Sequence, residues 1–110
     1  MKKLLLIGLA FLILTGCSAA PVQPDLTAVE AETMLNEGKD IVGKKVAVTV
    51  KDLVPASAFG YNIFDGEHLN FVSSENPKVE VNDKIIVTVT KVESMLGSFI
   101  ISYDNLTKVK

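Results

Sequence analysis

Two side chains in this 110-residue chain have chemistry that could define a function, and each is the only one of its type: Cys17 and His68. A thiol can act as a nucleophile, a metal ligand, a disulfide partner or a lipid attachment point. An imidazole can act as a general acid or base or as a metal ligand. Because the chain has no second cysteine, a disulfide within it is excluded. The neighbours of each residue decide which chemistry remains.

Cys17 follows an apolar run that begins after two lysines. Lys2 and Lys3 make a positive start, residues 4–14 are apolar or glycine, and Cys17 then precedes a stretch of small residues. A helix needs about 20 apolar residues to span a bilayer, whereas an export signal needs about 7 to 15. The run therefore predicts a signal peptide. A chance cysteine near an ordinary cleavage site is the alternative.

The stretch Leu14-Thr15-Gly16-Cys17 resembles the lipobox of bacterial lipoproteins. The resemblance implies that residues 1–16 are a signal peptide, that diacylglycerol is joined to the Cys17 sulfur, and that the new amino group is acylated. Two or more acyl chains hold a protein stably on a membrane. We therefore expect palmitate-type anchoring of an exported protein, on the outer face of the cell membrane or on the outer membrane. Residues 17–24 would form a lipidated, flexible tether.

His68 has Glu67 and Asn70 nearby in the sequence, but no nucleophile. On an extended strand Glu67 and His68 point to opposite faces, while Asn70 shares the face of His68. No group of Cys, His, Asp and Glu has the spacing of metal ligands, so a metal site would need acidic residues from separate strands. We expect no catalytic residue, no metal site, no cofactor and no enzymatic activity.

One short helix is expected over residues 27–37. Thr27 and Glu30 have the spacing of a capping box, and Gly38 suits the left-handed residue that ends a helix. Ala28, Ala31 and Leu35 would share its apolar face, with the other acidic residues of the segment, Glu32 and Glu37, pointing elsewhere.

Beyond Gly43 the apolar residues alternate, as in strands with one buried face. Asp65-Gly66 between two such runs predicts a hairpin. The expected fold is mainly β: a small five-stranded barrel, closed or nearly closed, preceded by the helix, in one domain over residues 25–110. The five strands are expected at residues 46–50, 61–64, 68–73, 84–92 and 98–103.

Two patterns resemble the OB-fold: Gly43-Lys44-x-Val46-x-Val48-x-Val50, and Val81-Asn82-Asp83-Lys84-Ile85-Ile86-Val87. They are most similar to small OB-like domains of bacterial envelope lipoproteins. Residues 57–62 and 66–71 also resemble uncharacterised domains on surface proteins of Gram-positive bacteria. An OB-fold usually has a helix between its third and fourth strands. Residues 74–82 are too short for one and contain Pro77, so that helix would be absent or a single turn.

Charge decides against the nucleic-acid binding that an OB-fold would allow. Without Lys2 and Lys3, nine of the 11 lysines face 13 acidic residues, a net charge of −4, and the chain has no arginine. Single-strand binders use a positive groove with stacking aromatic residues. After removal of residues 1–16, the only basic pair is Lys44-Lys45. Aromatic residues at alternating strand positions belong to the core more often than to a stacking surface.

A non-catalytic binding or interaction module on the envelope remains, with a protein or a glycan as its partner. Its expected binding surface is Tyr61, Asn62, His68 and Asn70, whose polar groups can hydrogen-bond an uncharged ligand or a partner chain. The alternatives are that these polar residues only face water in a structural envelope component, or that the chain is an OB-fold oligonucleotide binder.

Overall fold

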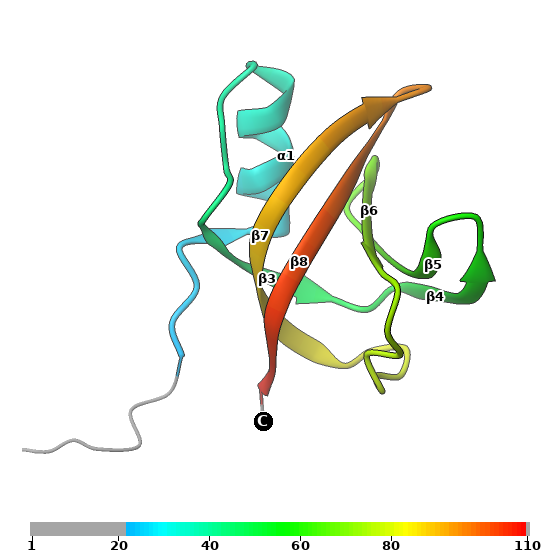
Figure 1. Ribbon diagram of the computed structural model, residues 1–110. Coiled ribbons are helices and arrows are strands. Elements are labelled where there is room, and N and C mark those ends of the chain that lie inside the picture. The colour runs from blue at the N-terminus through cyan, green and yellow to red at the C-terminus, as the bar shows by residue number, and fades with distance from the viewer. Residues whose placement is uncertain (1–21, 110) are drawn as a thin grey trace, which may run out of the picture.

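The described residues form a seven-stranded mixed sheet with one helix packed at one side of it (Figure 1). The computed structural model describes residues 22–109. The prediction of a mainly β chain with one short helix is confirmed. In chain order the elements are β2 (Leu26–Thr27), α1 (Ala28–Asn36), β3 (Lys45–Thr49), β4 (Asp52–Ser57), β5 (Gly60–Asp65), β6 (Leu69–Ser73), β7 (Lys84–Met95) and β8 (Ser98–Val109).

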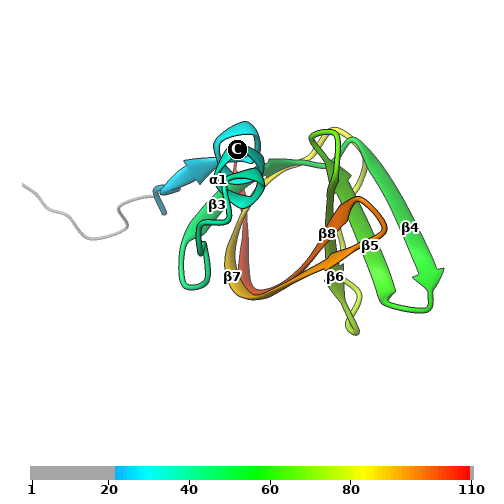
Figure 2. The ribbon, with the colours of Figure 1, turned by 90° about the horizontal axis from the view of Figure 1, so that it is seen from above.

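The sheet has the order β2-β3-β7-β8-β6-β5-β4. The β2–β3 and β6–β8 pairs are parallel, and the other neighbours are antiparallel. The long β7–β8 hairpin curves around the interior, which gives the sheet its curled outline in Figure 2. The sheet is open, because β2 and β4 are its two edges. The prediction of a five-stranded closed barrel is therefore wrong in strand number and in closure.

Two short edge strands account for this difference. Strand β4 contains Pro55, which has no N–H to donate and therefore favours a loop in a sequence-based analysis. Proline is tolerated in an edge strand, and β4 pairs with β5 alone. Strand β2 has only two residues, Leu26 and Thr27, opposite Val46 and Ala47. Two residues are too few to show an alternating pattern.

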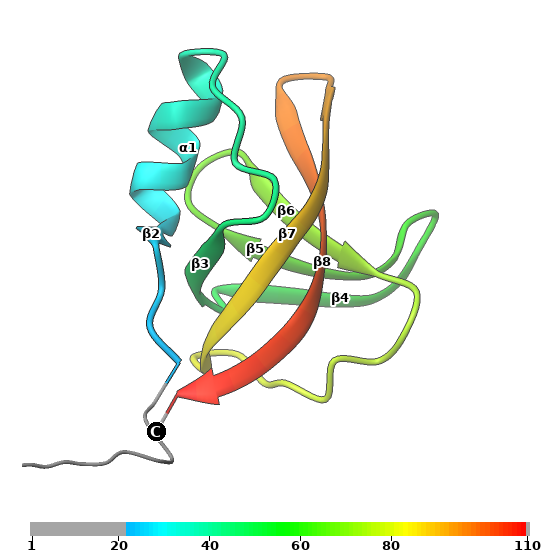
Figure 3. The same ribbon diagram turned by 60° about the vertical axis from the view of Figure 1, so that its left-hand side comes forward.

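Helix α1 begins and ends as its local residues predict. The Thr27 side chain accepts a hydrogen bond from the Glu30 N–H, and the Glu30 carboxylate accepts one from the Thr27 N–H, so the capping box is present. Gly38 has a φ of +79° and donates its N–H to the Leu35 carbonyl, which is the left-handed helix ending. Ala28 and Ala31 are buried, so the helix lays its small residues on the sheet beside β3 (Figure 3).

The core follows the alternation of the strands. Val48, Val87 and Ile101 are almost completely buried, as expected for inward-facing positions. Thr49 and Thr88, on the opposite face of their strands, are partly exposed. Val48, Val87 and Ile101 therefore point into the core, and Thr49 and Thr88 point away from it.

The hairpin expected around Asp65-Gly66 is present, but its turn is longer than two residues. Residues 66–68 form the turn, so His68 precedes β6 and does not lie in a strand. Strands β7 and β8 extend to Met95 and Val109, beyond their expected ends. Residues 74–82, all of which the structure describes, form no helix.

The anchoring segment cannot be compared with the structure. Cys17, the signal peptide over residues 1–16 and the tether up to residue 21 lie outside the described residues. Between residues 22 and 109, no helix is both long enough and apolar enough to cross a membrane.

Candidate functional site

The turn between β5 and β6 is held in place from both sides. Asp65, only 5% exposed, accepts the Gly66 N–H at 2.7 Å and the Thr49 N–H at 2.8 Å, which fixes the turn to β3. Gly66 has a φ of +70°, and a Cβ there would lie 2.6 Å from the Glu32 Oε1 atom. The left-handed conformation therefore favours glycine, and a Cβ at this position would displace the Glu32 carboxylate.

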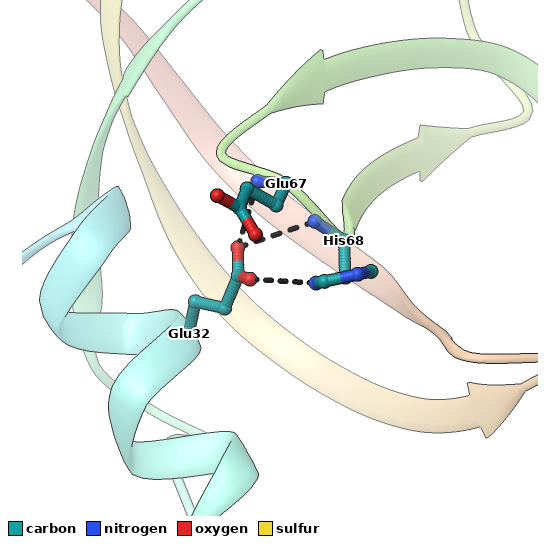
Figure 4. Close-up of side chains that lie close together, drawn as sticks. All are labelled: Glu32, Glu67 and His68. Carbon is teal, nitrogen blue, oxygen red and sulfur yellow. Dashed lines mark hydrogen bonds and ion pairs between the residues drawn. The ribbon is translucent and has the colours of Figure 1, made fainter.

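Glu32 joins helix α1 to this turn (Figure 4). Its Oε1 atom accepts the backbone N–H groups of Glu67 and His68 at 3.0 and 3.2 Å, and its Oε2 atom lies 2.8 Å from His68 Nδ1. An ionised carboxylate only accepts hydrogen bonds, so Nδ1 carries the proton and the Nε2 lone pair of a neutral His68 is left free. The carboxylate thus orients the imidazole.

The ionisation of Glu32 follows from these contacts. Burial alone would raise the pKa of its carboxyl, but the hydrogen bonds from His68 and Glu67 and the charge of a protonated His68 outweigh burial and lower the pKa. Glu32 therefore stays negative at neutral pH, although its side chain is only 13% exposed.

Glu67 completes a cluster of three groups that can bind a cation. Ligand atoms of Glu32, Glu67 and His68 all lie within 4.8 Å of one another. Glu32 and Glu67 line a cavity of about 220 Å³ between helix α1 and the turn. Thr33 lines this cavity, but its hydroxyl donates to the Val29 carbonyl and is engaged within the helix. The arrangement can hold a cation or orient a base, and it presents no activated nucleophile among the residues described.

The structure divides the expected binding surface into two parts. Asn62 and Asn70 are 2% and 7% exposed and bond to each other at 2.9 Å, and Asn62 also donates to the Gly60 carbonyl and to Ser57. Tyr61 is partly buried. His68 instead contacts helix α1 and is half exposed. The Asn70 Oδ1 atom is buried and has no hydrogen-bond partner among the described residues.

Glu32 is the site residue that the sequence analysis assigned to the wrong face. It was expected to point away from the apolar stripe, yet it faces the turn. Its separation of four residues from Ala28 and three from Leu35 places all three on one face of a helix, and that spacing was the available signal. The partner of Glu32 could not be predicted from the sequence, because His68 is 36 residues away.

A second surface feature lies at the tip of the β7–β8 hairpin. Met95 pairs with Ser98, so Leu96 and Gly97 form a two-residue turn, and their φ angles are +51° and +83°. Turns with two positive φ angles favour Asn-Gly, because a branched apolar residue is strained there. Leu96 is also 100% exposed. Neither backbone conformation nor burial explains a leucine at this position.

A larger cavity, about 520 Å³, lies elsewhere, between the residues before α1 and strands β3 and β7. It is lined mainly by apolar side chains, among them Val22, Val48 and Ile85, with Lys51 and Lys84 at its polar part. Lys51 and Asp65 of this lining form an ion pair at 3.5 Å, so these two charged groups engage each other within a mainly apolar lining.

Comparison with known protein families, curated proteins and solved structures found no match. Function therefore has to be inferred from the residues of this chain.

Proposed function

We propose that this chain is an exported, lipid-anchored envelope protein whose folded domain is a non-catalytic binding module for a partner molecule. The observation that carries the binding role is Leu96, a fully exposed leucine in a left-handed backbone conformation. The left-handed conformation costs free energy on folding, the exposed side chain recovers none of it by burial, and strained residues of this kind gather at functional positions. The anchor rests on the lipobox resemblance at Cys17.

We propose further that the curled sheet is a variant of the OB-fold. Three features support this. Strands β3 and β4 are separated by Val50 and Lys51 alone and pair with β7 and β5, so together they resemble one long bent first strand. Strands β6 and β8 pair in parallel. Helix α1 packs on β3 in place of the usual helix between the third and fourth strands.

The position of the hairpin tip suits a partner located away from the membrane. Figures 1 and 3 place the tip of the β7–β8 hairpin at the opposite end of the molecule from the C-terminus and from the start of the described chain. Cys17 precedes Val22 by five residues, which span at most about 18 Å. A domain tethered through Cys17 can therefore present this tip outward.

The chemistry of the tip favours a protein over a glycan. Leu96 and its neighbour Met95, which is 42% exposed, offer apolar surface and no hydrogen-bonding group for sugar hydroxyls. Lys91 and Glu93 on the same hairpin form an ion pair at 3.5 Å, so the tip has no excess positive charge for phosphates. An apolar pocket on a partner protein fits these residues, because the buried centre of a protein interface is more apolar than its rim.

The test is site-specific crosslinking in the envelope of the source organism. A photo-reactive residue at Ser94, exposed and two residues from the tip, reports whatever contacts the tip in the lipidated chain. Leu96→Asn places the preferred residue in the turn, so the fold should be retained and its unfolding midpoint should rise. Thr90→Asn, at an exposed position of β7, is the matched control.

A discrete protein adduct that is present in the wild type and in Thr90→Asn, and absent in Leu96→Asn, supports the proposal. An adduct that is unchanged in Leu96→Asn, or no adduct in any variant, contradicts it. The absence of an adduct in every variant would favour a purely structural envelope component.

A further inference from the structure

The cluster of Glu32, Glu67 and His68 has unused capacity to bind a ligand. The Glu32 Oε2 atom contacts only His68 within the described part of the chain. The Glu67 carboxylate forms no ion pair, and His68 Nε2 no hydrogen bond, with any described residue. Glu32 and Glu67 also line the cavity of about 220 Å³, which leaves room for water beside the two carboxylates.

We propose that Glu32, Glu67 and His68 bind one first-row transition-metal dication, with Zn²⁺ as the best-suited ion. The ion takes the place of the proton between Glu32 Oε2 and His68 Nδ1, and a Glu67 carboxylate oxygen supplies the third ligand. Water fills the fourth position. This site is independent of the hairpin tip and of the anchor.

The ligand set selects the class of metal. One imidazole nitrogen with two carboxylate oxygens suits zinc and similar transition metals, whereas Mg²⁺ and Ca²⁺ prefer oxygen ligands alone. A protein site with three ligands and one water is an open tetrahedral zinc site. Two carboxylates and a neutral imidazole also leave a −2 charge to balance the dication.

The ligand atoms, which lie within 4.8 Å of one another, have to shift for the site to close around an ion. Zinc lies about 2.0 to 2.2 Å from nitrogen and oxygen ligands, so ligand atoms at tetrahedral angles are about 3.3 Å apart. The observed 2.8 Å between Glu32 Oε2 and His68 Nδ1 therefore has to widen by about 0.5 Å. Glu32 is fixed by two backbone N–H groups, while His68 is half exposed and Glu67 exposed, so the turn residues move.

Protons balance without a further reactant. A neutral His68 gives up its Nδ1 proton and takes one at Nε2 from solvent, so the imidazole stays neutral and binds through Nδ1. A protonated His68 releases one proton to solvent when the metal binds. Binding therefore weakens as the pH falls, because protons compete for the nitrogen.

The experiment uses the full chain carrying Cys17→Ala, which removes the only thiol that could bind zinc. ZnCl₂ is titrated by calorimetry at neutral pH, with MgCl₂ as the ion comparison. His68 is the sole histidine, so its ring nitrogen resonances are assigned without ambiguity and report which nitrogen binds the metal. Glu67→Gln and His68→Gln remove ligands, and Glu75→Gln makes the same charge change at an exposed residue outside the cluster.

We expect one saturable zinc site, a change at the Nδ1 resonance, and no comparable response to Mg²⁺. Losing either ligand should weaken zinc binding by at least about tenfold, because replacing a residue that only hydrogen-bonds to a metal ligand already lowers metal affinity or activity about 10 to 100-fold. Glu75→Gln should bind like the parent chain. Absence of saturable binding, an unchanged His68 resonance, or equal affinity in Glu67→Gln and Glu75→Gln would overturn the proposal.

Discussion

Replacing Glu32 by alanine tests how strongly helix α1 is fixed to the β5–β6 turn. The change removes three hydrogen bonds to one ionised carboxylate, from the N–H groups of Glu67 and His68 and from His68 Nδ1. A hydrogen bond to a charged group contributes about 1.5 to 3 kcal/mol when it is buried. The donors here are partly solvated and recover water in the variant, so the three bonds together should contribute about 2 to 3 kcal/mol, well below their sum.

The measurement is equilibrium unfolding in urea, with the midpoint compared at an unchanged slope. Glu37→Ala is the matched control, because Glu37 lies at the end of the same helix and its ion pair with Lys39 is exposed on both sides. Such pairs contribute about 0 to 1 kcal/mol. Equal, small losses in Glu32→Ala and Glu37→Ala would refute the claim that Glu32 fixes the turn.

Three further predictions concern pH, the core and the anchor. The pKa of the Glu32 carboxyl is lowered in the folded state, so its contribution to stability is full well above pH 4.5 and is lost as the pH falls through the folded-state pKa. Glu32→Gln should therefore flatten the decline in unfolding free energy between pH 7 and 3. Parallel curves for the variant and the wild type would disprove this. Val87→Ala should cost about 1 to 4 kcal/mol and Thr88→Ala no more than about 1, by denaturant midpoints, and equal losses would contradict the assigned strand phase. Cys17→Ala should abolish incorporation of a fatty-acid analogue, whereas persistent labelling would exclude the lipoprotein assignment.

Local signals predicted the helix and the main strands. The capping residues Thr27 and Glu30 and the terminating Gly38 act within one or two turns of chain, so their effect is visible in the sequence. Strands with one buried face, such as β3 and β7, alternate buried and more exposed residues, and this pattern is also visible among neighbours in the sequence. These features depend on neighbours that the sequence lists side by side.

Edges and closure depend on neighbours that are distant in the sequence. Whether Pro55 interrupts β4 depends on which side of that strand is paired, and only the sheet order shows that one side is free. Whether the sheet closes depends on its two edge strands, and neither β2 nor β4 was expected. A count of alternating runs therefore gave the fold class but not the closure.

The candidate site was harder to predict from the sequence than the fold. The chain neighbours of His68 offer it no chemical partner, because its partner Glu32 comes from helix α1. Spacing within the helix could have placed Glu32 on the buried face, but not opposite a particular turn. Leu96 was not singled out either, because its exposure and positive φ become evident only in the folded hairpin.

We propose that Leu96 is present for binding, at the expense of backbone strain. The most direct measurement is quantitative capture of the crosslinked partner from solubilised envelope by the wild-type chain, Leu96→Asn and Thr90→Asn, with the unfolding midpoint of each chain recorded. We expect Leu96→Asn to be the most stable of the three chains and to capture the least partner, and Thr90→Asn to capture as much partner as the wild type. Capture by Leu96→Asn at the wild-type level would contradict it.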